Sequence, residues 1–134
     1  NRMRVAQTVR RNGTEPVARA MIPDLLAEGT REERPDVEEA VREMILATPP
    51  ETVIAALAGM ACRHDSTGDL PDMDLPALVI VGEHDAITPP DTARAMADAI
   101  PEAELVVIAD AGHLSPMENS GAFNEAMTGF LSRL

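Results

Sequence analysis

Two short apolar runs constrain the fold of this chain more than any other feature of its sequence. Ala77–Val81 and Leu105–Ile108 are continuous and rich in β-branched residues, and the first run is bounded by Pro76 and Gly82. A strand with one face in water alternates apolar and polar residues, and neither run alternates. The runs therefore predict two parallel strands in an α/β sheet that helices cover on both faces.

Helical patterns lie between and after these two strands. Thr88 is expected to cap the first helix, and either Asn119 or Ser120 begins the second. The order strand, helix, strand, helix forms a right-handed βαβα unit by default. Residues 77–134 are therefore predicted to be an α/β structure, a βαβα unit with parallel strands.

Residues 1–62 show helical periodicity and no plausible strand. The stretch 63–76, RHDSTGDLPDMDLP, is polar and rich in Pro, Gly and Asp, and is expected to be a linker. The chain thus divides into a helical segment at 1–62, this linker at 63–76 and the α/β part at 77–134. Three methionines of the helical segment are expected to pack in the core, with a flexible apolar substrate pocket as the alternative: Met21, Met44 and Met60.

Charge and composition exclude several classes of function. The formal net charge of −12 argues against nucleic acid, whose phosphates would repel the chain. No apolar run approaches the roughly 18 residues of a membrane span, so no membrane partner is expected. The single cysteine, Cys62, is expected to be a buried, inert thiol, and one unpaired cysteine fits a reducing, cytoplasmic compartment.

Chemically useful side chains follow both strands. Asp85 comes four residues after Val81, and His113 comes five residues after Ile108. Because the carboxyl ends of parallel strands share one edge of a sheet, Asp85 and His113 are expected to meet there. A carboxylate beside an imidazole accepts the Nδ1 proton, fixes the tautomer and stabilises the imidazolium that forms when Nε2 takes a proton. Gly112 is expected to let the backbone bend so that His113 points back over the sheet.

Other polar residues are weaker candidates. His84 is expected to face away from the site, and Glu118 and Asn119 to be cap residues of the last helix. A metal site built from the histidines and Asp85 is not expected, because no two of them have a close metal-binding spacing and no second thiol is present. No metal or organic cofactor is predicted.

In these two loops the chain resembles the C-terminal part of the α/β-hydrolase superfamily, over almost everything after residue 74. In that family a G-x-x-D turn after one late strand supplies the acid of a catalytic triad, and a Gly-His pair after the final strand supplies the base. Gly82–Asp85 and Gly112–His113 match these motifs. The resemblance implies that residues 1–62 are part of a lid, and it is nearest to esterases, lactonases and enzymes of the 3-oxoadipate enol-lactonase type.

The nucleophile that this resemblance implies is not found in the sequence. None of the four serines lies in a G-x-S-x-G motif: Ser66, Ser115, Ser120 and Ser132. The chain also opens inside a helical pattern, as NRMRVAQTVRR, so we expect it to be cut from a longer protein and to be inactive alone. The nucleophile stays open between Ser, Cys and Asp, and Asp would indicate a dehalogenase or an epoxide hydrolase.

A non-catalytic interaction module is the alternative class. Two apolar strands leave pairing edges exposed and cannot cover both faces of a sheet. Each Val or Ile side chain left in water forgoes roughly 1.5–3 kcal/mol of burial free energy. We therefore expect two kinds of partner: a small-molecule substrate for the full-length protein, and for this chain either its missing N-terminal half or a second copy of itself.

Overall fold

The computed structural model describes residues 2–134. Five helices come first, followed by a short 3-10 helix and then by two strands and three helices. In chain order these elements are α1 (Arg2–Asn12), α2 (Glu15–Leu25), α3 (Glu28–Glu33), α4 (Pro35–Ala47), α5 (Pro50–Cys62), η1 (Thr67–Asp72), β1 (Leu78–Gly82), α6 (Pro90–Ala99), β2 (Glu104–Ile108), α7 (Ser115–Glu118) and α8 (Ser120–Leu131).

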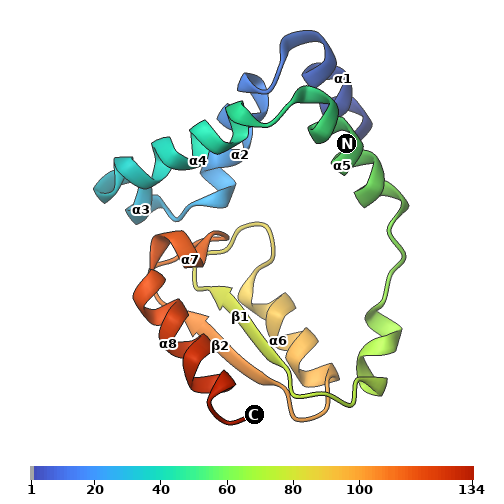
Figure 1. The fold of residues 1–134 in the computed structure, drawn as a ribbon, viewed down its shortest axis with the longest axis vertical. Coiled ribbons are helices and arrows are strands. Elements are labelled where there is room, and N and C mark those ends of the chain that lie inside the picture. The colour runs from blue at the N-terminus through green and yellow to red at the C-terminus, as the bar shows by residue number, and fades with distance from the viewer. Residues whose placement is uncertain (1) are drawn as a thin grey trace.

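The strands β1 and β2 form a two-stranded parallel sheet. Leu78 lies opposite Glu104, and Gly82 lies opposite Ile108, so the two strands end at the same edge. The crossover helix α6 and the final helix α8 flank the strands on either side (Figure 1). The predicted α/β class, with a βαβα order and parallel strands, is confirmed.

Helices cover only part of the sheet. Among residues 78–82 and 104–108, only Val81, Gly82 and Ile108 are buried, and the side chain of Val107 is 41% exposed. The strands of this chain are thus only partly covered, which agrees with the expectation that two strands alone cannot cover both faces of a sheet. The physical reason is that, among the described elements, two helices contact a sheet of two strands and leave part of its surface in water.

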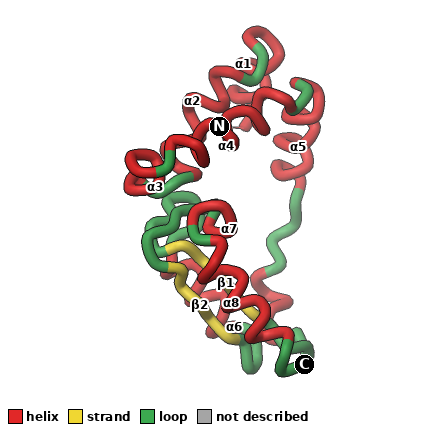
Figure 2. The backbone as a smooth tube through the Cα atoms, turned by 60° about the vertical axis from the view of Figure 1, so that its left-hand side comes forward, coloured by secondary structure: helices red, strands yellow, loops and turns green. Residues whose placement is uncertain are grey.

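The five N-terminal helices have a core of their own. Helix α2 packs on α4, and α1 packs on α5, so the helical segment forms an arch above the sheet (Figure 1). Its buried cluster consists of Ala18, Ile22, Leu25, Leu26, Val37 and Val41. Leu114 and Met117, which follow β2, pack against this same cluster. The α2–α3 end of the arch therefore rests on the loop after β2, beside α7 (Figure 2).

Two predictions about packing in the helical segment are wrong. Met21, Met44 and Met60 are 41%, 51% and 40% exposed, and Cys62 is exposed at the end of α5. Met21 and Met60 instead line an apolar groove of about 260 Å³ between α2, α4 and α5.

Taken singly, none of the helices within residues 2–134 has both the length and the apolar character needed to cross a bilayer. Helices α4 and α5, which meet at a bend of 93°, pass that test as a pair on length and composition only.

Candidate active site

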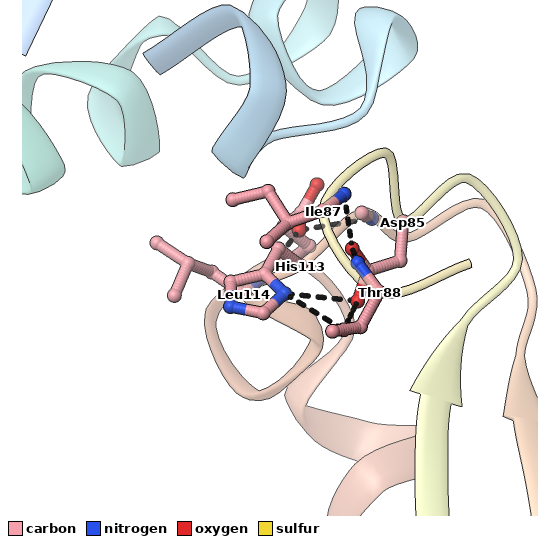
Figure 3. Close-up of polar contacts among 7 residues, drawn as sticks. Asp85, Ile87, Thr88, His113 and Leu114 are labelled. Carbon is pink, nitrogen blue, oxygen red and sulfur yellow. Dashed lines mark hydrogen bonds and ion pairs between the residues drawn. The ribbon is translucent and has the colours of Figure 1, made fainter. Parts of the chain in front are cut away.

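Asp85 and His113 meet above the shared edge of the two strands. Asp85 lies in the turn after β1, and His113 lies in the loop after β2. The Nδ1 atom of His113 is 2.9 Å from Oδ2 of Asp85 (Figure 3). The side chain of Asp85 is 5% exposed and that of His113 is 33% exposed. The structure thus brings together the two residues that the sequence predicted to meet, one buried and one open to solvent.

Asp85 is held by its own turn. Its Oδ1 accepts the backbone N–H groups of Ile87 and Thr88, both at 2.8 Å, and its Oδ2 accepts the hydroxyl of Thr88 at 2.8 Å. Burial alone would raise the pKa of Asp85. The hydrogen bonds from the Thr88 N–H, the His113 ring, the Thr88 hydroxyl and the Ile87 N–H outweigh burial, so the pKa of this carboxyl lies below its usual value.

This geometry fixes the tautomer of His113. An ionised carboxylate can only accept hydrogen bonds, so the ring nitrogen that faces Asp85 must carry a proton. In the neutral ring Nε2 then has a lone pair and can accept a proton. The arrangement can therefore serve as an oriented base whose imidazolium form is stabilised by a buried negative charge.

Thr88 has a different role from the one the sequence suggested. It was expected to cap the helix after β1, but α6 begins at Pro90, with Pro89 in the cap position and no side-chain cap hydrogen bond. The hydroxyl of Thr88 binds Asp85 instead and lies 3.4 Å from Nδ1 of His113. Thr88 therefore belongs to the site. Its spacing of three residues from Asp85 is typical of a turn that an Asp side chain stabilises, and this spacing could have predicted the contact from the sequence.

Both Glu118 and Asn119 were expected to cap the last helix, and only Asn119 does so. The side chain of Asn119 caps α8 by accepting the N–H of Ala122 at 3.2 Å. The carboxylate of Glu118 does not cap that helix. It accepts hydrogen bonds from the loop that carries His113 and from the α2–α3 turn of the helical segment. No sequence pattern indicated this, because Glu118 and its partner Ala27 lie 91 residues apart in the chain.

Gly112 is needed for a reason other than the one predicted. Among the described glycines only Gly13 has a positive φ, so Gly112 does not provide an unusual bend. A Cβ atom at Gly112 would lie 2.6 Å from the backbone nitrogen of Ala27 and 2.9 Å from the carbonyl carbon of Leu26. The backbone of the helical segment therefore approaches the loop before His113 too closely for any side chain.

The remaining polar candidates lie outside the contact between Asp85 and His113. The side chain of His84 is exposed, and its backbone N–H donates to the carbonyl oxygen of Ala111 at 2.8 Å. Possible ligand atoms of Glu83, His84 and Asp110 lie within 4.8 Å of one another, and all three residues are exposed. Exposed acidic groups often gather in this way without a metal, so this group does not by itself make a metal site.

Comparison with known proteins identifies relatives over most of the chain. The family model described as TAP-like protein matches residues 59–133, more than half of the chain. A thermophilic esterase from Thermogutta terrifontis, in a malate-bound structure, is 50% identical with a TM-score of 0.96, over 99% of this chain and 49% of the esterase. The enol-lactonase of Burkholderia xenovorans LB400 is 30% identical with a TM-score of 0.87, over 95% of this chain and 48% of the enol-lactonase.

A third relative also matches nearly all of this chain with about half of its own length. The 3-oxoadipate enol-lactonase 2 of Acinetobacter baylyi is 27% identical over 128 residues, which are 96% of this chain and 47% of that protein. The chain therefore spans about half the length of each of these three relatives.

Proposed function

This chain belongs to the α/β-hydrolase superfamily, and on that premise we propose that it supplies the base and the orienting acid of a hydrolase that cleaves an ester or a lactone. His113 is the proposed general base, and Asp85 is the carboxylate that orients it. The observation that most strongly supports these roles is the contact of 2.9 Å between Nδ1 of His113 and Oδ2 of Asp85. The lowered pKa of Asp85 adds support, because it reflects hydrogen bonds that favour the ionised carboxylate in spite of its burial.

In the proposed mechanism each proton has a defined path. Nε2 of His113 takes the proton of the attacking nucleophile as the nucleophile bonds to the carbonyl carbon of the substrate. Asp85 stabilises the resulting imidazolium. The imidazolium then gives its proton to the departing alkoxide, and an acyl-enzyme remains. Water then attacks this acyl group while His113 takes a proton from it, and the imidazolium gives that proton to the departing nucleophile, so the carboxylic acid is released and both groups are restored.

The proposed substrate class follows from the relatives. Three of the relatives that cover nearly the whole chain are described as an esterase and as enol-lactonases. Esters and lactones both present an acyl carbon bonded to an oxygen leaving group, so one triad can cleave either. No step of this mechanism requires a metal or an organic cofactor.

We further propose that the nucleophile comes from another part of the full-length protein. None of the serines in this chain lies in a G-x-S-x-G motif. Residues 1–62 would form part of the lid, 63–76 the linker and 77–134 the C-terminal βαβα part of the core. Exposed side chains on the faces of its sheet, such as that of Val107, would be covered by further helices of the full-length protein. The 134-residue chain alone is then expected to be inactive, because oxyanion hole and nucleophile are both outside it.

The experiment that tests this proposal is a hydrolysis assay of the full-length protein. p-Nitrophenyl acetate and a small lactone serve as substrates, with a haloalkane and an epoxide as comparisons. We expect turnover of the ester or the lactone, and a loss of at least about 10³-fold in kcat for His113→Ala. His64→Ala is the matched control, since His64 is exposed in the segment before η1, and it should leave kcat unchanged.

Three results would contradict parts of the proposal. Full turnover by His113→Ala would refute the role of the base. Cleavage of the haloalkane or the epoxide alone would indicate an aspartate nucleophile and refute the ester or lactone class. Absence of all turnover, with self-association of the chain in analytical ultracentrifugation, would favour the interaction module.

A further inference from the structure

The carboxylate of Glu118 holds the backbone on both sides of His113. Its Oε1 accepts the N–H of Gly112 at 2.9 Å and the N–H of Leu114 at 3.1 Å. These are the two residues that flank His113 in the chain. One oxygen atom therefore fixes the loop on either side of the imidazole without touching the ring.

The other oxygen of Glu118 holds the helical segment. Its Oε2 accepts the backbone N–H of Ala27 at 2.8 Å and the hydroxyl of Thr30 at 2.9 Å. Ala27 and Thr30 are both buried, at 3% and 8% exposure. The two sets of donors lie on opposite sides of one side chain, so the position of the α2–α3 turn and that of the His113 loop depend on the same carboxylate.

Contacts around Glu118 extend this connection. The N–H of Leu114 also lies 3.2 Å from the carbonyl oxygen of Leu25, and Leu114 and Met117 pack against the buried cluster of the helical segment. The close approach of Gly112 to the Leu26–Ala27 backbone completes the contact. The loop that carries His113 is thus built into the core of the helical segment.

Only a carboxylate satisfies this set of partners. Four donors point at Glu118, and an ionised carboxylate offers two accepting oxygens and no proton of its own. A glutamine in the same place would turn its amide –NH₂ toward either the backbone N–H of Ala27 or those of Gly112 and Leu114. Toward the helical segment, the amide faces the N–H of Ala27 donor to donor, while the Thr30 hydroxyl can rotate to accept. Toward the His113 loop, it faces the N–H groups of both Gly112 and Leu114. At least one native hydrogen bond is therefore lost in either orientation.

We propose that Glu118 is a positioning residue for the reaction, which fastens the helical segment to the loop of His113 and so sets the place of the base. This inference rests on the proposed role of His113. Catalytic rate depends steeply on such placement, since an error of about 1 Å at a reacting group costs on the order of 10²-fold. Glu118 itself does not touch the imidazole or the reacting atoms, and its effect is carried by the backbone of Gly112 and Leu114.

The test compares Glu118→Gln with Glu125→Gln in the full-length protein, with p-nitrophenyl acetate as the substrate. Glu125 is exposed on α8 and undergoes the same chemical change. We expect Glu118→Gln to lower kcat by roughly 10- to 100-fold while KM changes by less than about threefold, at a temperature at which circular dichroism shows the protein folded. Glu125→Gln should leave both constants unchanged. A side chain that only stabilises the fold would alter the melting temperature and leave kcat of the folded enzyme at its native value.

Thr30→Val keeps the inference testable if Glu118→Gln does not fold. It removes one of the four donors with little change in shape, and we expect kcat to fall by about two- to tenfold, with Thr30→Ser restoring it. Native kcat in folded Glu118→Gln, or native kcat in Thr30→Val when Glu118→Gln is unfolded, would overturn the positioning role. If His113→Ala lowers kcat while Glu118→Gln does not, the inference about Glu118 fails alone. If neither variant lowers kcat, the proposed function fails with it.

Discussion

His113 and Asp85, 28 residues apart in the chain, lie in contact through Nδ1 and Oδ2 at 2.9 Å. Two parallel strands in register and two short loops produce this contact, because both strands end at the same edge of the sheet. The same Oδ2 atom also accepts the hydroxyl of Thr88. The carboxylate that orients the imidazole is therefore itself oriented by its own turn.

Replacing Thr88 with Val should weaken this orientation without abolishing it. The variant loses the hydrogen bond from the hydroxyl to Oδ2 of Asp85, while the two backbone N–H groups on Oδ1 remain. We expect kcat to fall by about two- to tenfold, which corresponds to the roughly 0.5–1.5 kcal/mol of one hydrogen bond. Thr88→Ser, which keeps the hydroxyl, is the control. Equal rates for the Val variant and the wild type would show that the Thr88 hydroxyl is dispensable.

Gly112→Ala should destabilise the contact between the helical segment and the His113 loop. The new methyl group would meet the backbone nitrogen of Ala27 at 2.6 Å, so one of the two backbones has to move. We expect a loss of about 1–3 kcal/mol in the free energy of unfolding, measured by urea denaturation of the full-length protein.

Gly59→Ala is the matched control for this substitution. Gly59 lies within α5, and a Cβ atom there meets nothing within 4 Å. Alanine favours a helix over glycine by roughly 0.5–1 kcal/mol, so this variant should gain stability. A neutral Gly112→Ala, beside a stabilised Gly59→Ala, would contradict the close approach at Gly112.

The pKa of Asp85 predicts a dependence of stability on acidity. Its pKa in the folded protein lies below the ordinary value, about 3.9 in an unfolded chain. Such a group contributes stability that is present above the unfolded pKa and is lost as the pH falls through the folded pKa. The free energy of unfolding should therefore decrease below about pH 4.

The free energy of unfolding should depend less steeply on pH in the Asp85→Asn variant. Asp36→Asn is the comparison, because Asp36 also has a lowered pKa, but its pair with Arg34 is exposed and such pairs contribute little. Urea unfolding at several pH values between about 6 and 3, a range that includes the ordinary carboxyl pKa, measures the free energy of unfolding of each protein as a function of pH. Identical slopes for wild type and Asp85→Asn would refute the hydrogen-bonded, ionised state of Asp85.

The sequence predicted the parts of the fold that depend on local pattern. The two strands, the helix between them and the meeting of Asp85 with His113 all follow from apolar runs and from the shared edge of parallel strands. The Asn119 cap is also local, since its partner lies three residues away. Patterns of this kind are set by neighbours in the chain, so one sequence is enough to find them.

The features that the sequence did not predict depend on contacts between distant segments. The binding of Ala27 and Thr30 by Glu118 joins positions 91 and 88 residues apart, and no periodicity connects them. The exposure of Met60 and Cys62 likewise depends on which helices cover α5, and helical periodicity in that segment cannot specify the covering partner. The Thr88 cap is a local exception: that prediction is wrong because the carboxylate of Asp85, three residues earlier, binds the Thr88 hydroxyl.

The measurement that tests the central claim most directly is kcat of the full-length protein with Asp85→Asn on p-nitrophenyl acetate. Asparagine can still accept the N–H groups of Ile87 and Thr88, but its –NH₂ group then faces Nδ1 of His113 and favours the wrong tautomer. We predict a fall in kcat of on the order of 10³- to 10⁴-fold with the fold retained. A folded Asp85→Asn protein with native kcat would contradict the account, because the oriented imidazole would then not be the base.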